Sequence, residues 1–211
     1  MCGSICWKIC RVTGPGGMIN PNIQVCRTGI IKRDEVIKIE KTLYFAYGSN
    51  MNRNQMAFRC PDAEPIQTVR LEGYRLEFCA NGGGNGVATV LPDPDSHVDG
   101  VLWRISDRDE NHLNHYEGYP YLYGKEILTV TDQNGNRLKV MAYSMNRPYR
   151  DSPALPSRTY LEGILNGCRQ NGIPTRPILE TVQRIQNQLP HEEKAYDKGF
   201  RRKNRREPEW R

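Results

Sequence analysis

The chain has 211 residues, of which 37% are apolar, and a formal net charge of +6. A domain of this length buries a sizeable core, but the apolar share is below that of most globular chains, which indicates one domain with extra segments. Residues 1–41 hold seven basic and three acidic residues, residues 198–211 hold seven and two, and residues 42–197 hold sixteen and nineteen. Because the positive charge sits at the ends, the composition argues against a nucleic-acid-binding core.

Seven cysteines are present, an odd number in a chain too long to need disulfide staples. The chain shows no charged start followed by an apolar run, and no stretch approaches the roughly 20 apolar residues that span a bilayer. We therefore expect a cytoplasmic protein with free thiols and no membrane partner.

The first 41 residues are unusual. Cys2, Cys6 and Cys10 recur every four residues, and Cys26 is a further thiol. This spacing lacks the paired knuckles of zinc sites. We expect no metal here and treat residues 1–41 as an N-terminal extension of unknown function.

Strand and helix signals begin at residue 42. Residues 42–46 are rich in β-formers, and Tyr47-Gly-Ser-Asn50 leads into a short helix over 51–59, for which Ser49 or Asn50 is the expected N-cap. Further β-strands are predicted over 63–69, 74–80, 87–91 and 98–105. Glycines in 81–86 and prolines in 92–95 indicate plain connections between them.

The second half combines helices with one hairpin. A helix is predicted over 106–116 with Ser106 as N-cap, and strands over 123–131 and 137–144 surround an Asn-Gly turn. Two more helices follow, over 157–171 with Ser157 as the expected cap and over 177–189. The basic, polar residues 191–211 are expected to be a disordered tail.

This order of elements argues for an α+β protein. About six or seven strands of this length could form a small, mixed, partly closed β-barrel with flanking helices. We place that domain at residues 42–190.

Two segments could carry chemistry. The loop and helix start that follow residue 46 would present unpaired backbone N–H groups, which suit a carboxylate or phosphate, although the phosphate-loop pattern is missing. Glu117 ends a helix among several tyrosines, where loss of water should raise its pKa toward that of a general base near neutral pH. On local evidence alone, an ordinary helix cap and a surface acid are the favoured explanations of these segments.

Other catalytic arrangements find little support. The four histidines are scattered, no histidine partner can be named for Cys79, and no metal-ligand spacing is visible.

The sequence resembles the gamma-glutamylcyclotransferases in four places that follow the family's order. Tyr44-Phe-Ala-Tyr-Gly-Ser-Asn-Met51 resembles the signature substrate loop. Gly86-Val-Ala-Thr89 with Gly100-Val-Leu-Trp-Arg-Ile105 resembles the central strands, and Tyr116-Glu-Gly118 resembles the segment of the catalytic glutamate. Ala142-Tyr-Ser-Met145, Pro156-Ser157 with Tyr160, and Asn171-Gly-Ile-Pro174 resemble the last strand and late helix.

The resemblance implies a mixed barrel with an open cavity and an enzyme that needs no metal or organic cofactor. A gamma-glutamyl amide would cyclise through its own α-amino group, giving 5-oxoproline and a free amine, with Glu117 as the catalytic acid and base. The substrate would be held by Tyr143, with either Tyr121 or Tyr123 at a further tyrosine position, and by the loop residues Tyr44, Phe45, Ala46, Tyr47, Gly48, Ser49 and Asn50.

Several alternatives stay open. The leaving group could be an amino acid, an amine or a natural product, and the fold could serve as a binding module without turnover. An isopeptide substrate is disfavoured, because enzymes of that kind usually show another loop after the tyrosine and glycine. The sequence leaves a homodimer open, and any nucleic-acid contact would be confined to the basic tail.

Overall fold

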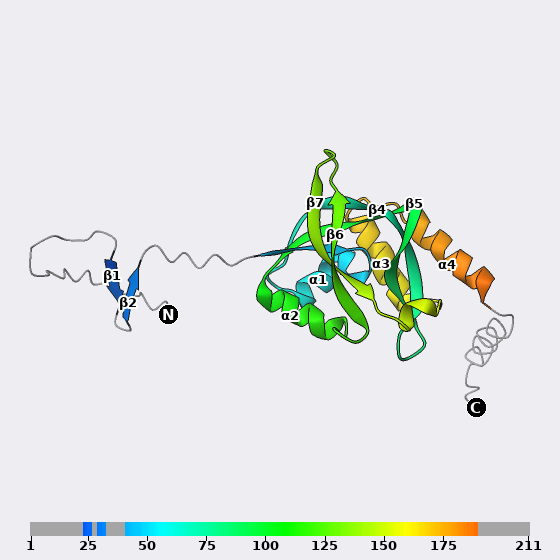
Figure 1. Cartoon of the computed structure of the whole chain (residues 1–211), viewed down its shortest axis with the longest axis horizontal. Helices are drawn as coiled ribbons and strands as arrows, with labels where there is room; N and C mark the ends of the chain where they lie inside the picture. Colours follow the sequence, from blue (N-terminus) through cyan, green and yellow to red (C-terminus); the bar gives the residue numbers. More distant parts are fainter. Residues whose placement is uncertain (1–22, 27–28, 33–40, 190–211) are drawn as a thin grey trace, which may run out of the picture. The chain divides into compact units, whose positions relative to one another are not determined.

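The computed structural model describes residues 23–26, 29–32 and 41–189 (Figure 1). These belong to two units, divided between Glu40 and Lys41. In the first unit, β1 (Ile23–Cys26) pairs antiparallel with β2 (Gly29–Lys32). The cysteines at positions 2, 6 and 10 and the basic tail lie outside the described residues.

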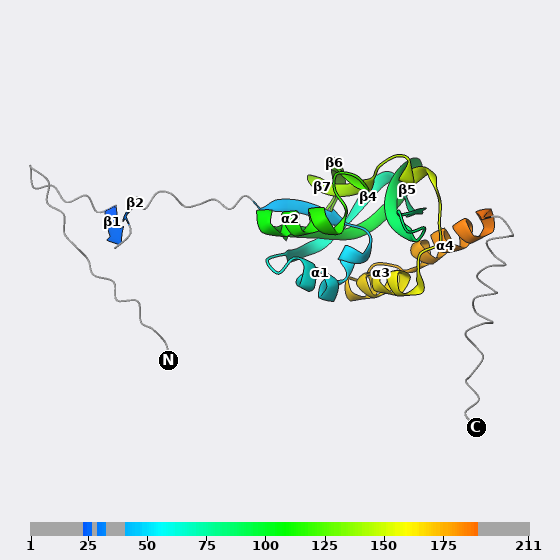
Figure 2. The same cartoon turned by 90° about the horizontal axis from the view of Figure 1, so that it is seen from below.

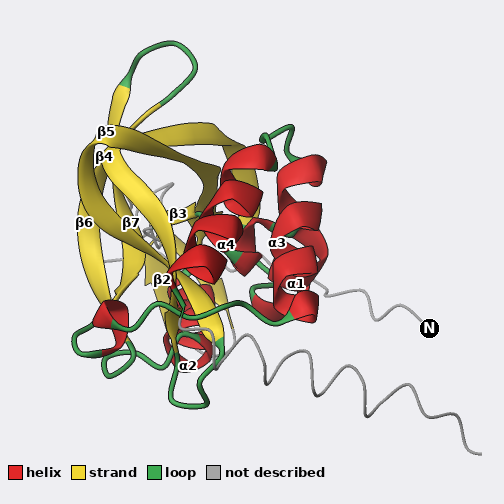
Figure 3. Cartoon of the chain, turned by 90° about the vertical axis from the view of Figure 1, so that its right-hand side faces the viewer, coloured by secondary structure: helices red, strands yellow, loops and turns green. Residues whose placement is uncertain are grey.

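Five strands of the second unit close into a barrel in the order β3-β5-β4-β6-β7 (Figure 3). The strands are β3 (Thr42–Ala46), β4 (Glu64–Ala80), β5 (Gly86–Ile105), β6 (Tyr123–Thr131) and β7 (Arg137–Met145). Neighbours are antiparallel except where β3 meets β7 in parallel, at Tyr44 and Met141. The expected α+β fold with a mixed barrel is confirmed.

The barrel has fewer and longer strands than predicted. The segments 63–69 and 74–80 form the single strand β4, and 87–91 and 98–105 form the single strand β5. The turn signals between them mark a register shift at Glu72 and Tyr74, where Gly73 has a φ of 77°. A bulge bends a strand without ending its pairing, so the two strands curve around the barrel instead of stopping.

Helices lie outside the barrel. Figures 2 and 3 show α1 (Arg53–Arg59), α3 (Arg158–Gln170) and α4 (Arg176–Gln188) on one flank. The remaining helix, α2 (Asp107–Tyr116), contacts α1. Two single 3-10 turns, η1 (Ser49–Met51) and η2 (Tyr149–Asp151), are also present. None of the helices within the described ranges has the length and apolar character needed to cross a membrane.

The helix caps are partly as predicted. Ser106 caps α2 in a capping box, and Ser157 caps α3 by accepting from the N–H of Tyr160. The cap of α1 is Asn52, which accepts from the N–H groups of Asn54 and Gln55, so the expectation of Ser49 or Asn50 was wrong. A 3-10 turn over Ser49–Met51 delays the helix start and leaves those two side chains free for other contacts.

A buried ion pair links α4 to the barrel. Glu77 of β4 is only 2% exposed, and Arg184 donates from Nη1 to its Oε2 at 2.9 Å. Because a buried carboxylate without a partner costs free energy, this pair fixes the position of α4 against β4.

Candidate active site

A cavity of about 240 Å³ brings together residues from β3, β5, β6, β7, the end of α2 and α3. It is lined by Tyr44, Tyr47, Gly48, Ser49, Asn50, Asn81, Val87, Ala88, Tyr116, Glu117, Leu122, Tyr123, Tyr143 and Tyr160. The cavity is therefore mainly aromatic, with one carboxylate in its wall.

The loop after β3 lines this cavity with the residues from Tyr47 to Asn50. Within the described part of the chain, no hydrogen bond leaves the backbone N–H groups of Gly48, Ser49 and Asn50. Gly48 sits close to its neighbours, because a Cβ there would lie 3.2 Å from the Cβ of Ala88. Unpaired N–H groups beside a cavity provide a natural site for a carboxylate or an oxyanion.

Helix α3 holds this loop from behind through small residues. Gly163 and Gly167 are one turn apart, and a Cβ on Gly167 would lie 2.7 Å from the backbone N of Asn52. Asn52 donates from Nδ2 to the carbonyl of Gly163 at 3.2 Å, and Asn171 donates to the carbonyl of Met51 at 2.9 Å. The loop conformation thus depends on a close approach that only glycine allows.

Glu117 is placed by the end of α2. Gly118 has a φ of 64°, and the N–H of Tyr119 bonds to the carbonyl of Asn114 at 2.9 Å. This is the Schellman arrangement, which ends a helix at a glycine in the left-handed region. Glu117 is therefore the last residue before the chain turns away, and its carboxylate lines the cavity.

Asn50 connects the loop to this carboxylate. Its Nδ2 donates to Oε1 of Glu117 at 2.8 Å and to the hydroxyl of Tyr44 at 2.8 Å. Removal from water raises the pKa of Glu117 to about 7, while the Asn50 hydrogen bond and the Arg59 charge act in the opposite direction. A carboxyl with this pKa can accept and return a proton near neutral pH.

The tyrosines around Glu117 are held by hydrogen bonds. The hydroxyl of Tyr143 donates to Oδ1 of Asn114 at 2.8 Å, and the hydroxyl of Tyr123 donates to the carbonyl of Ala88 at 2.6 Å. The N–H of Ala88 donates to the hydroxyl of Tyr160 at 3.1 Å. Burial raises the pKa of all three hydroxyls, so they stay neutral near pH 7.

The predicted residues are not all at the cavity. Glu117, Tyr143, Tyr44 and the loop from Tyr47 to Asn50 line it together. Phe45 and Ala46 do not line it, and both are buried in the core. For Phe45 the reason is strand alternation, since it follows Tyr44 on the opposite face.

The structure also adds residues to the site. Of the two tyrosines left open, Tyr123 lines the cavity and Tyr121 is 84% exposed. Sequence reasoning gave no role to Asn81, Tyr116 or Arg59, whose guanidinium contacts Ser49 and Asn50. The contacts of Asn81 and Arg59 arise only when distant segments meet, so no local pattern marked these two, whereas Tyr116 stands beside Glu117 in the motif that resembles the family.

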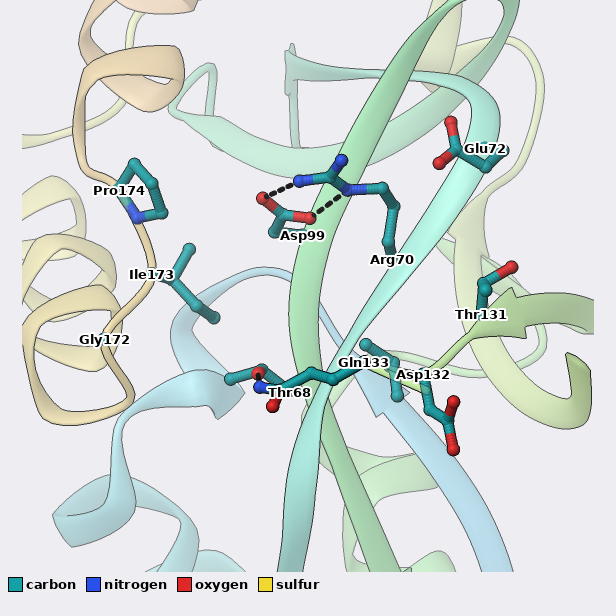
Figure 4. Close-up of a pocket in the computed structure, with 11 residues that line it drawn as sticks. Thr68, Arg70, Glu72, Asp99, Thr131, Asp132, Gln133, Gly172, Ile173 and Pro174 are labelled. Atoms are coloured by element: carbon teal, nitrogen blue, oxygen red, sulfur yellow. Dashed lines mark hydrogen bonds and ion pairs between the residues drawn. The ribbon is translucent and has the colours of Figure 1, made fainter. Parts of the chain in front are cut away.

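Two further hollows lack such an arrangement. Figure 4 shows the first, about 390 Å³ in volume, where Arg70 and Asp99 form a two-pronged ion pair at 2.7 and 3.1 Å. The second, of about 680 Å³, runs between β5 and α4. Neither contains a buried, unpaired carboxyl facing free backbone N–H groups.

Comparison with known proteins agrees with this geometry. Residues 44–162 match the family profile described as gamma-glutamyl cyclotransferase, AIG2-like. The chain belongs to the gamma-glutamylcyclotransferase family. The resemblance seen in the sequence is confirmed, and membership of this family makes the chain an enzyme of the cyclotransferase type.

Relatives in this family cover most of the chain. The gamma-glutamylcyclotransferase of Bos taurus is 30% identical over 163 residues, 74% of this chain and 83% of the relative. That of Homo sapiens is 32% identical over 142 residues, 64% of this chain and 74% of the relative. A solved structure of a gamma-glutamyl cyclotransferase superposes with a TM-score of 0.59 at 30% identity, covering 70% of this chain and 87% of the other.

Proposed function

We propose that this family member converts a gamma-glutamyl amide into 5-oxoproline and a free amine, with Glu117 as general base and then general acid. One observation carries the proposal. Glu117, whose pKa is raised to about 7, shares a cavity with three backbone N–H groups free of hydrogen bonds and is linked to their loop through Asn50. The cavity thus offers a proton carrier beside donors for negative charge.

The reaction needs no protein nucleophile. Glu117 takes a proton from the α-ammonium of the substrate, and the freed amine attacks the γ-carbonyl carbon. A carbon–nitrogen bond forms within the substrate and a five-membered ring results. Because the attack is intramolecular, the protein must chiefly hold the chain of the substrate in its bent form.

The free N–H groups would stabilise the negative charge of this step. As the ring closes, the γ-carbonyl oxygen becomes an oxyanion, and the N–H groups from Gly48 to Asn50 are placed to donate to it or to the α-carboxylate. When the oxyanion collapses, the bond to the leaving nitrogen breaks. Glu117 returns its proton to that nitrogen, and the ring nitrogen gives up its second proton to water, so a neutral lactam and a neutral amine result.

The aromatic residues complete the substrate site in this proposal. Tyr44 and Tyr143 meet edge to face with ring centroids 5.9 Å apart, which fixes one wall. The hydroxyl of Tyr160 accepts from the N–H of Ala88, so its own hydrogen can be donated to a substrate oxygen. Tyr47 and Tyr123 add further wall surface.

The test is release of 5-oxoproline from a panel of gamma-glutamyl amino acids, amines and natural-product conjugates. We expect product from the intact chain and a loss of about 10³-fold or more in Glu117→Gln. Glu162→Gln is the matched control, since this exposed acid of α3 pairs with Arg169. Equal turnover in Glu117→Gln would contradict its role, and no product from any panel member would favour a binding module.

We also propose that residues 42–190 form the catalytic unit, within which Cys60, Cys79 and Cys168 are buried free thiols, as suits a reducing cytoplasm. Limited proteolysis of the full chain that removes both ends should leave turnover unchanged. Loss of turnover together with the ends would show that they contribute to the site.

A further inference from the structure

Arg59, the last residue of α1, folds its side chain back over the substrate loop. Its Nη1 donates to Oδ1 of Asn50 and, at 3.1 Å, to Oγ of Ser49, while Nη2 donates to Oε1 of Gln55 at 2.8 Å. The guanidinium carbon lies 3.7 Å from the ring centroid of Tyr116. Four neighbours therefore hold this one planar group.

Arg59 does not line the cavity, and it has no ion-pair partner among residues 41–189. Burying a cation without a carboxylate partner costs desolvation free energy. The contacts of Arg59 with Asn50, Ser49, Gln55 and Tyr116 offset part of that cost. The charge of Arg59 lowers the pKa of Glu117, whose carboxylate accepts a hydrogen bond from the amide of Asn50.

The contact with Asn50 decides how that amide is oriented. A guanidinium has five N–H donors and no acceptor, so the atom of Asn50 that faces Arg59 must be the oxygen. The NH₂ group then faces Glu117 and Tyr44. With the amide turned over, its oxygen would face the Glu117 carboxylate, and two acceptors would repel each other.

We propose that Arg59 is a positioning residue for the reaction: by fixing the Asn50 amide, it keeps two N–H donors on Glu117 and Tyr44 and holds the substrate loop against α2. This inference rests on the proposed function. Arg59 contacts neither the substrate nor the reacting atoms and acts through Asn50 and Ser49.

Among residues 41–189, Arg59 is also the one cation whose charge lowers the pKa of Glu117. Lys125, whose Nζ lies 5.9 Å from the ring centroid of the cavity residue Tyr143, is paired with Glu110. Burial raises the pKa of the hydroxyls and the thiol that feel the charge of Glu117, so these groups are neutral near pH 7: Tyr44, Tyr47, Cys60, Tyr123, Tyr143 and Tyr160. Without Arg59, only the hydrogen bond from Asn50 would oppose the rise in the Glu117 pKa that burial causes.

Two substitutions separate the charge of Arg59 from its shape. Arg59→Met removes both, and Arg59→Lys keeps the charge but cannot reach Asn50, Ser49 and Gln55 at once with a planar fork. Arg70→Met is the matched control, since Arg70 pairs with Asp99 beside the hollow of Figure 4. Each variant is made in the full chain and checked by thermal unfolding.

The first measurement is the titration of the Glu117 carboxyl by carbon NMR, which needs no turnover. We expect the midpoint to rise by about one pH unit in Arg59→Met and to change little in Arg59→Lys or Arg70→Met. Glu117 titrating in Arg59→Met as in the intact chain would overturn the proposal.

The second measurement is kcat and KM with the best panel substrate. We expect kcat at pH 7 to fall by about 10- to 100-fold in Arg59→Met and about tenfold in Arg59→Lys, with KM less affected. An unchanged kcat in both variants would also overturn the proposal. If the intact chain releases no 5-oxoproline at all, the proposed function fails by itself, and the NMR titration still decides whether Arg59 controls Glu117.

Discussion

The amide nitrogen of Asn50 lies 2.8 Å from Oε1 of Glu117, although the two residues are 67 positions apart in the chain. Asn50 belongs to the loop with the free N–H groups, and Glu117 ends α2. The proposed proton carrier and the proposed oxyanion site are thus joined by one hydrogen bond, so a change on either side should affect the other.

Removing the amide of Asn50 should raise the pKa of Glu117, because a donor to its charged form is lost. In Asn50→Leu we expect the acidic limb of the kcat/KM profile to move above pH 7 and kcat to fall by about 10²-fold. Asn50→Asp places a second acid beside Glu117 and should move the limb further up. A limb that stays near pH 7 in both variants would contradict this coupling.

Glu117 should make the fold less stable at high pH. Its pKa of about 7 is above the usual value near 4.3, so its ionised form is favoured less in the folded chain than in the unfolded one. The contribution of this group to the free energy of unfolding is fully present below its pKa in the unfolded chain, and it is lost as the pH rises through its folded-state pKa of about 7. Glu117→Gln should therefore be more stable than the intact chain at pH 8 by about 1–3 kcal/mol, with little difference at pH 4.

Chemical denaturation of both proteins at a series of pH values measures this difference. A constant difference across the series would mean that the surroundings of Glu117 do not raise its pKa.

A methyl group on Gly167 should impair activity without entering the cavity. The added Cβ would lie 2.7 Å from the backbone N of Asn52 and 2.9 Å from the carbonyl carbon of Met51, so the loop must move. In Gly167→Ala we expect a loss of about 1–3 kcal/mol in stability and a fall in kcat, measured by unfolding and 5-oxoproline release.

Gly163→Ala is the matched control on the same helix. There the nearest atom is Nε2 at the end of the Gln55 side chain, so a side chain that also contacts Arg59 would shift while the loop backbone stays in place, and we expect a smaller loss than in Gly167→Ala. Alanine also favours helix by up to about 1 kcal/mol. An equal loss in both variants would mean that the backbone contact at Gly167 has no special part in placing the loop.

Two nearby tyrosines should respond differently to loss of their hydroxyl groups. Tyr123→Phe leaves the carbonyl of Ala88 without its 2.6 Å partner in the cavity wall, and we expect a higher KM and about 1 kcal/mol lower stability. Tyr121→Phe should change neither, because that side chain is 84% exposed. A larger effect at Tyr121 would place it, rather than Tyr123, in the substrate site.

The sequence alone determined the family and the α+β class, and its resemblance to that family singled out the loop at Gly48 and Glu117 as candidate site residues. Each is carried by neighbouring residues, so it can be recognised without the fold. The caps Ser106 and Ser157 belong here too, because a cap accepts hydrogen bonds from residues two or three positions ahead.

Only the tertiary structure decided how these parts meet. Gly73 was expected to separate two strands, but pairing with β5 resumes beyond it after a register shift, and β4 runs unbroken. The burial of Tyr123 rather than Tyr121 and the contact of Arg59 with Asn50 likewise depend on segments that the closed barrel brings together. Side-chain direction and burial are set by partners far away in the chain, so no local pattern could specify them.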